Sequence, residues 1–198
     1  MLTKGQKFCK RSFDIIFSVL ALVILWPLML LAIIISTIET KQNGLFFQKR
    51  IGKDAKPFFI IKIRTMQTDQ EDQNTITTAE DSRITKVGTF FRRNKIDELP
   101  QLINVLLGNM SFVGPRPDVE GYADTLEGDD KIILSVKPGV TGPATLKYKD
   151  EEELLSQAEN PQKYNDEVLW PDKVKINKEY VQNWSFSKDL SYIIRTFK

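Results

Sequence analysis

The chain has 198 residues and a formal net charge of +2, so it is long enough for one domain with a core, and its overall charge identifies no partner. It contains no histidine and a single cysteine, Cys9, which excludes histidine-based catalytic triads, histidine-ligated metals and intramolecular disulfides. Basic residues gather in residues 1–11, 41–66 and 83–96, and local positive charge attracts the phosphates of lipids, nucleotides or nucleic acids.

The first predicted element is an uncharged, mostly apolar run over residues 15–38, long enough to cross a bilayer as a helix. It is too long for a cleaved signal peptide and is not followed by a cleavage site, and a buried core helix of this length would usually have a polar face. Pro27 divides the run into halves that reach only past mid-bilayer, and the basic flanks favour the cytoplasm for both ends. These features leave open a re-entrant hairpin that breaks at Pro27 and a single span with a tolerated kink.

A β-hairpin is predicted next. Residues 45–51 and 57–64 read as two strands around a turn, because Lys62 and Arg64 alternate with isoleucines in the second strand. Residues 65–81 are polar and acidic without periodicity, so we expect a loop there.

Three helices are predicted in the rest of the chain. Residues 84–91 have apolar side chains at helical spacing with basic residues between them, which is typical of a helix in a membrane interface and fits a packed amphipathic helix equally well. Residues 99–107 repeat leucine and isoleucine at helical spacing, with Pro100 in the first turn and Gly108 at the end. Residues 190–197 form a last short amphipathic helix.

The most informative polar residues are Asp97 and Glu98, at the start of the helix predicted over residues 99–107. Acidic residues there often only cap the helix and complement its dipole. However, three cations lie just upstream, and downstream Pro115 and Pro117 hold Arg116 in a stiff loop. A fixed guanidinium suits bidentate phosphate binding, although a surface ion pair would also explain Arg116. Carboxylates among cations could bind Mg²⁺ and phosphates together.

The sequence lacks GxGxxG, P-loop and Asp-x-Asp motifs, so dinucleotide and nucleoside-triphosphate sites have no support. Instead, a series of ordered motifs resembles the bacterial sugar transferase family, the monotopic phosphoglycosyl transferases. The resemblance covers nearly the whole chain and fits the small members of the family. In one departure, the helix break is Trp26-Pro27, where the family commonly has Ser-Pro. The motifs are FFQKRIG (46–52), IKIRTM (61–66), RR (92–93), DELPQ (97–101), NVL (104–106), MSFVGPRP (110–117) and KPGVTG (137–142).

The resemblance implies an α+β fold at the cytoplasmic face of the bacterial inner membrane. Residues 1–40 would form a membrane-inserted re-entrant helix-break-helix with its break at Pro27. Residues 41–198 would form a cytoplasmic catalytic domain, small, mixed and largely helical, with a short β-hairpin and interfacial amphipathic helices. Residues 118–136 and 144–183 depart most from the motifs and are expected to shape the sugar site. Monomer and dimer both remain open.

The resemblance also implies a two-step reaction, the first membrane step of glycan assembly. Asp97 would attack the sugar-linked phosphate of a UDP-sugar and release UMP, and polyprenol (undecaprenyl) phosphate would then take the phosphosugar from the aspartate, with Glu98 assisting. Mg²⁺ is expected at Asp97 and Glu98. The residues expected to bind substrate phosphates or to shape their site are Arg116, Arg92, Lys62, Arg64, Pro115 and Pro117.

Two other functions compete with this interpretation. The basic stretches with interleaved phenylalanines fit a membrane-anchored nucleic-acid-binding module, but the acidic segments and the near-neutral total charge argue against it, so we expect no nucleic-acid partner. A Mg²⁺-dependent phosphatase with Asp97 as nucleophile would release free phosphate from simple phosphoesters and would need no polyprenol acceptor.

Overall fold

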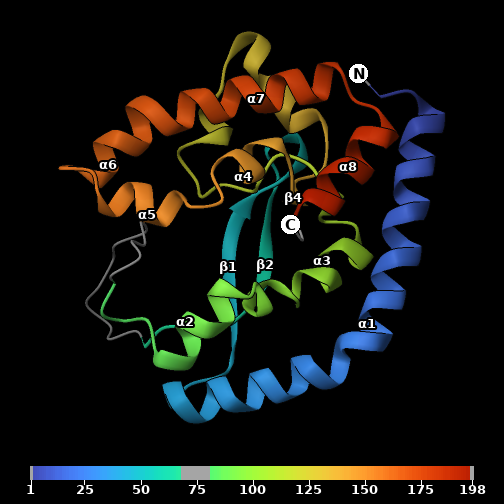
Figure 1. The fold of residues 1–198 in the computed structure, drawn as a ribbon. Coiled ribbons are helices and arrows are strands. Elements are labelled where there is room, and N and C mark those ends of the chain that lie inside the picture. Colours follow the sequence, from blue (N-terminus) through green and yellow to red (C-terminus); the bar gives the residue numbers. More distant parts are fainter. Residues whose placement is uncertain (1, 68–80, 197–198) are drawn as a thin grey trace.

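The computed structural model describes residues 2–67 and 81–196, so most of the predicted loop 65–81 lies outside the described residues. The fold mixes helices with two small sheets, in agreement with the α+β prediction, and a long N-terminal helix, α1 (Lys4–Thr40), borders the rest of the chain on two sides (Figure 1). The other main elements are β1 (Leu45–Ile51), β2 (Pro57–Ile63), α2 (Lys86–Arg93), the 3₁₀ turn η2 (Ile96–Glu98), α3 (Gln101–Leu107), β3 (Ser111–Val113), the 3₁₀ segment η4 (Gly128–Ser135), β4 (Gly139–Thr141), α4 (Pro143–Lys147), α5 (Glu151–Ser156), α6 (Pro161–Tyr164), the π-helical turn η5 (Asn165–Leu169), α7 (Trp170–Gln182) and α8 (Phe186–Thr196).

Helix α1 is continuous but bent. It begins at a capping box formed by Thr3 and Gln6 and contains Pro27, and its ribbon turns a corner about half way along (Figure 1). A proline inside a helix removes a backbone donor and is a common cause of such a kink. Among the described residues, α1 is the one helix long and apolar enough to cross a membrane, and only 17% of its most apolar 18-residue window is buried.

Both ends of α1 are bonded to the same body. Near its start, Arg11 donates to two carbonyl oxygens at the end of α3 (2.6 and 2.7 Å), and Asp14 accepts from a backbone N–H of β3 (3.1 Å). Near its end, Ser36 donates to the carbonyl oxygen of the residue after β2 (2.5 Å), and Glu39 accepts from a backbone N–H in the first turn of α2 (3.1 Å). The middle of α1 is therefore left facing outward.

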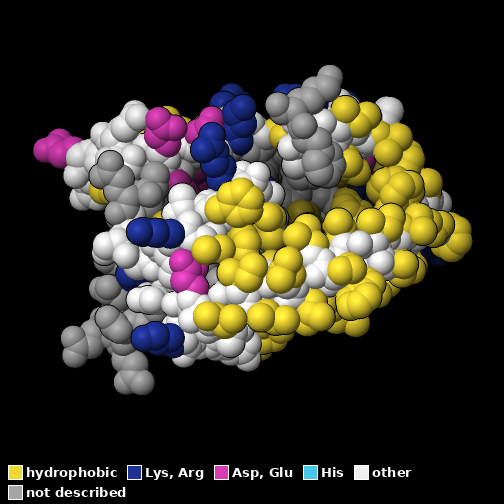
Figure 2. Space-filling view, turned by 60° about the horizontal axis from the view of Figure 1, so that its bottom comes forward, with side chains coloured by type: hydrophobic (Ala, Val, Ile, Leu, Met, Phe, Trp, Pro, Cys, Tyr) yellow, Lys and Arg dark blue, Asp and Glu magenta, His cyan; other side chains and the backbone are white. Residues whose placement is uncertain are grey.

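The exposed part of α1 forms a broad apolar surface. Figure 2 shows apolar side chains along α1, with Lys, Arg, Asp and Glu side chains grouped to one side of them. Phe90 of α2 and Leu107 of α3 are also largely exposed. The exposed large apolar side chains of α1 are Phe8, Ile15, Ile16, Phe17, Val19, Leu20, Val23, Ile24, Trp26, Leu28, Leu30, Leu31, Ile34 and Ile38.

The predicted hairpin is confirmed. Strands β1 and β2 pair antiparallel, from Leu45 opposite Ile63 to Ile51 opposite Pro57. The side chain of Asn104 joins this hairpin to α3, since its amide nitrogen donates to a carbonyl oxygen of β2 (2.8 Å) and its oxygen accepts from a backbone N–H of β2 (3.0 Å). Because Asn104 is buried, these bonds fix α3 against the hairpin.

A second pair of strands was not predicted. Strands β3 and β4 are three residues each and pair in parallel, with Ser111 opposite Gly139. The N–H of Gly139 also donates to the carbonyl oxygen of Pro115 (2.8 Å). A side chain at Gly139 would collide with the backbone of Gly114, so the close approach requires glycine here. This pairing holds the loop that carries Arg116.

The predicted helices are confirmed as α2, α3 and α8. In α3, Pro100 is the N-cap and Gly108 ends the helix with a φ of 87°, as expected for a glycine after the last turn. Helix α8 is tied to α7 and α1 by the buried Asp189, which accepts from the hydroxyl of Tyr180 (2.8 Å) and pairs with Lys10. The helices between residues 143 and 182 were not predicted.

Candidate active site

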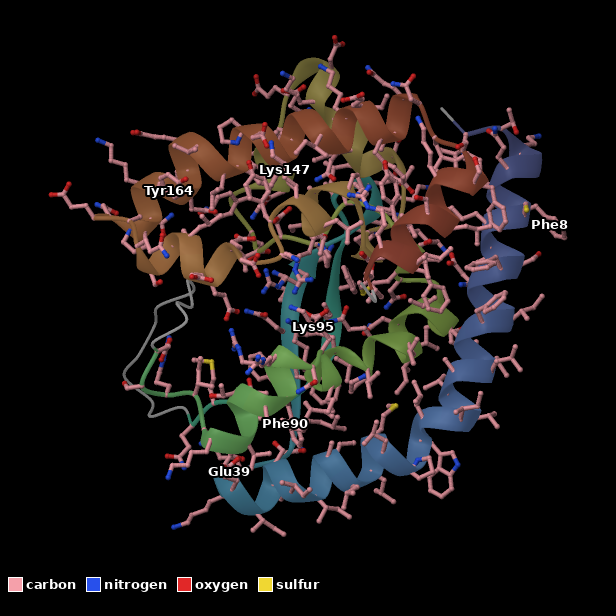
Figure 3. All side chains as sticks on the ribbon, viewed as in Figure 1. Phe8, Glu39, Phe90, Lys95, Lys147 and Tyr164 are labelled. Atoms are coloured by element: carbon pink, nitrogen blue, oxygen red, sulfur yellow. The ribbon has the colours of Figure 1, made fainter. Side chains whose placement is uncertain are left out.

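The turn η2 presents both carboxylates between α2 and α3. Lys95, just before it, has a left-handed backbone with a φ of 55°, which reverses the chain between the two helices. The N–H of Glu98 then donates to the carbonyl oxygen of Lys95 (3.3 Å). Asp97 and Glu98 therefore lie in a 3₁₀ turn that precedes α3 and are not part of the helix. Figure 3 shows Lys95 near the middle of the molecule, beside the hairpin.

Glu98 is held between two cations. One of its carboxylate oxygens, Oε1, accepts from Nη2 of Arg116 (2.6 Å) and lies 3.6 Å from Nζ of Lys62. The Glu98 side chain is only 11% exposed. Burial alone would raise the pKa of Glu98, but Arg116 and Lys62 together hold that pKa well below its ordinary value. Glu98 therefore remains ionised, and its charge positions the ammonium group of Lys62 and the guanidinium group of Arg116.

Asp97 has a different environment. The residue is 7% exposed, and its buried oxygen Oδ1 has no hydrogen-bond partner within the described part of the chain. Burial raises the pKa of Asp97 above its ordinary value, and Lys62 opposes that rise most strongly. Leaving a buried acceptor unpaired costs about 1–3 kcal/mol, so this oxygen is suited to a ligand from outside the protein.

Further cations surround the acidic pair. Arg92 of α2 pairs with Glu152 of α5 and contacts the sulfur of Met66, and its charge lowers the pKa of Asp97. Burial lowers the pKa of Lys62, and the charge of Glu98 acts in the opposite direction and raises it. Arg92 and Lys62 therefore bring positive charge close to Asp97, which favours the binding of a phosphate-bearing molecule.

The structure brings together most of the residues selected from the sequence. Asp97, Glu98, Arg116 and Lys62 form one cluster, with Arg92 near Asp97. Pro115 and Pro117 flank Arg116 in the loop after β3, and the carbonyl oxygen of Pro115 accepts a hydrogen bond from the N–H of Gly139 in β4. Pro27 lies within α1 and is not part of this cluster.

Arg64 lies elsewhere. Its Nε donates to the carbonyl oxygen of Asn43 (2.8 Å), and its guanidinium carbon lies 5.3 Å from the centre of the Phe46 ring. Burial lowers the pKa of Arg64. These contacts join Arg64 to the start of the hairpin and not to Glu98, so the structure gives it a different setting from Lys62.

Sequence reasoning missed two members of the cluster, Arg50 and Asp118. The guanidinium of Arg50 is held by Oε1 of Gln48 (2.6 and 3.2 Å), and burial lowers its pKa to about 10. Burial raises the pKa of Asp118 to about 6, against the charges of Lys173 and Arg50. Strand alternation is the available signal for Arg50, since the pairing register puts it on the same face of the hairpin as Lys62.

These features are those of a protein with one long, largely exposed apolar helix, suited to membrane association, and two carboxylates held among cations. The chain matches the description "Bacterial sugar transferase" over residues 5–198 and belongs to that family.

Named relatives agree with the family. The UDP-glucose:undecaprenyl-phosphate glucose-1-phosphate transferase of Escherichia coli (strain K12) is 34% identical over 98% of this chain and 40% of its own length. A protein of the same name from Klebsiella pneumoniae is 36% identical over 94% of this chain and 39% of its own length. The exopolysaccharide production protein ExoY of Sinorhizobium fredii (strain NBRC 101917 / NGR234) is 31% identical over 94% of this chain and 83% of its own length. The chain thus spans about two fifths of the first two relatives.

Proposed function

We propose that this protein transfers a sugar-1-phosphate from a UDP-sugar to polyprenol phosphate and releases UMP. The observation that carries the proposal is the pairing of two unlike carboxylates: Asp97 is buried with a free oxygen, and Glu98 is ionised and bound to Arg116 and Lys62. Relatives named as undecaprenyl-phosphate sugar phosphotransferases support the choice of substrates.

In the first step, an oxygen of Asp97 attacks the phosphorus atom bonded to the sugar. An oxygen–phosphorus bond forms to Asp97, the bond from that phosphorus to the bridging oxygen breaks, and UMP leaves with the electron pair. An ionised carboxylate needs no base to act as a nucleophile, which suits a chain without histidine. In the second step, an oxygen of polyprenol phosphate attacks the same phosphorus and frees Asp97.

The cations make this chemistry feasible because a carboxylate and a diphosphate repel each other. Arg116 is 40% exposed in its side chain, so its guanidinium is available to a substrate phosphate while Nη2 stays on Glu98. Nζ of Lys62 lies 3.6 Å from the same carboxylate oxygen. Glu98 thus fixes two cations where negative charge accumulates, and fixed charges need not reorganise during the reaction.

The residues present also fit Mg²⁺. The unpaired Oδ1 of Asp97 is a suitable ligand atom, whereas Oε1 of Glu98 is already bound to Arg116. The described residues contain no group of three or more His, Cys, Asp or Glu side chains that could hold a metal, and Mg²⁺ commonly takes one or two carboxylates together with substrate phosphates. Bound there, Mg²⁺ would neutralise phosphate charge.

We further propose that α1 enters the membrane as a re-entrant helix, with the catalytic residues on the cytoplasmic face. A straight helix of 37 residues would be about 55 Å long, and its ends would lie on opposite sides of the bilayer. Instead Arg11 and Glu39, near its two ends, bond to the same body. The bend at the middle and the exposed apolar side chains support insertion of that middle alone (Figures 1 and 2).

UMP release from a panel of UDP-sugars, with and without undecaprenyl phosphate, tests the proposed function. We expect continuous turnover with the acceptor and at most one UMP per enzyme without it. Asp97→Asn should abolish UMP release with and without the acceptor. Asp129→Asn, which removes an exposed carboxylate, should leave UMP release unchanged under both conditions. Free phosphate released from simple phosphoesters without acceptor would instead support a phosphatase.

A further inference from the structure

Two cations meet at the end of α3, outside the candidate active site. A Cβ atom added to Gly108 would lie 3.0 Å from Nζ of Lys137 and 3.2 Å from Nη2 of Arg11. Both groups therefore approach one point, although Arg11 belongs to α1 and Lys137 lies just before β4. We call these two residues the Gly108 cation pair.

The charge of this pair is poorly balanced. Arg11 donates to the carbonyl oxygens of Val105 and Leu106, but a guanidinium has more N–H donors than these two bonds use. Lys137 is half-buried and has neither a hydrogen bond nor an ion pair within residues 2–67 and 81–196. Asp14 attracts it, but one oxygen of Asp14 already accepts two bonds from β3. Burial and Arg11 both lower the pKa of Lys137, whereas Asp14 raises it, so an anion that approaches Lys137 would stabilise its charged form.

The pair lies at the edge of the apolar surface. Leu107, next to Gly108, is 67% exposed, and Phe8 of α1 is 75% exposed and points away from the body (Figure 3). The exposed apolar residues of α1 resume at Ile15, four residues after Arg11, which corresponds to about 6 Å along a helix. Cations at that distance from an inserted apolar segment are at the depth of lipid headgroups.

The pair is also separate from the carboxylates. Helix α3 has seven residues and is therefore about 10 Å long. Asp97 lies before its first residue and Gly108 after its last. A phosphate between Arg11 and Lys137 is therefore not the phosphate that meets Asp97.

We propose that the Gly108 cation pair binds the phosphate group of an anionic membrane phospholipid. The remaining donors of Arg11 offer directional bonds to phosphate oxygens, and the ammonium group of Lys137 supplies a second positive charge. The acyl chains would lie along the apolar surface beside Leu107 and α1. The bound lipid neutralises a charge that the protein itself leaves unbalanced, and fixes the depth at which the start of α1 sits.

Binding of fluorescent phosphatidylglycerol to the purified full-length chain in neutral detergent, followed by anisotropy, tests this proposal. Lys137→Gln should weaken binding about fivefold or more, as expected for one cation at an anionic lipid. The matched control is Lys41→Gln, which removes an exposed lysine at the other end of α1 and should change binding less than twofold. Without lipid, Lys137→Gln should unfold at the wild-type temperature or higher, because it relieves repulsion with Arg11. Added phosphatidylglycerol should stabilise the wild type more than the variant.

Three results would overturn the proposal. If Lys137→Gln and Lys41→Gln lost the same amount of affinity for phosphatidylglycerol, the lipid would be attracted diffusely and not bound at the pair. Displacement of the lipid by millimolar inorganic phosphate would show that the site takes a free anion. Equal stabilisation of both proteins by lipid would show that Lys137 is not a ligand. The assay contains no sugar nucleotide, so its outcome is independent of the proposed reaction.

Discussion

Replacement of Arg116 by lysine isolates the contribution of the guanidinium. The change keeps the positive charge but removes the planar group whose Nη2 donates to Glu98 at 2.6 Å. Hydrogen bonds between charged groups contribute about 1.5–3 kcal/mol, and each 1.36 kcal/mol in the activation free energy is tenfold in rate. We therefore expect kcat/KM for UMP release to fall roughly 10- to 100-fold in Arg116→Lys.

The assay is steady-state UMP release with undecaprenyl phosphate in detergent, accompanied by membrane flotation. Flotation should not change, because most of the exposed apolar side chains belong to α1, whereas Arg116 lies in the loop after β3. Arg195→Lys, an exposed arginine in α8, is the matched control and should stay within twofold of wild type. Activity of Arg116→Lys within the same twofold would refute the assigned role of the guanidinium.

Three other outcomes follow from the structure. Glu98→Gln should lower kcat/KM at least tenfold without unfolding, because two cations lose their counter-charge; near-wild-type kinetics would contradict this. Since the pKa of Asp118 is raised to about 6 in the folded protein, the free energy of unfolding should fall by roughly 3 kcal/mol as the pH rises from about 4 through 6. Urea unfolding of Asp118→Asn should not show this fall. In a Cys9→Ser background, cysteines at positions 3 and 43 should label only from the cytoplasm, and Pro27→Leu should expose position 3 outside. External labelling of position 3 without the Pro27 change would rule out the hairpin.

Local patterns predicted much of the fold. The hairpin follows from alternation around Lys62, α3 from its leucine repeat with Gly108 at the end, and α8 from its apolar spacing. The pairing of β3 with β4 was not predictable in this way. Each strand has three residues and they are far apart in sequence, so no periodicity connects Ser111 with Gly139.

The candidate site shows the same division. Asp97, Glu98 and Arg116 were selected by sequence, but the bond between Glu98 and Arg116 depends on the position that the β3–β4 pair gives their loop. Arg64 and Lys62 are two residues apart and carry the same charge, yet Lys62 lies beside Glu98 whereas Arg64 does not. Arg64 follows the last residue of β2, and its bond to the carbonyl oxygen of Asn43 holds it at the start of the hairpin. The motifs that resemble the family selected the candidate residues, whereas tertiary contacts determine which cations lie beside the two carboxylates.

Covalent capture at Asp97 tests the central claim most directly. The enzyme is incubated with a UDP-sugar labelled in the sugar, without polyprenol phosphate, denatured at low pH and digested for mass spectrometry. The proposed mechanism predicts a phosphosugar on Asp97, absent from Asp97→Asn and removed when undecaprenyl phosphate is added before denaturation. Normal turnover with acceptor, but no label on Asp97 at any time without it, would contradict the covalent mechanism and indicate a single direct displacement.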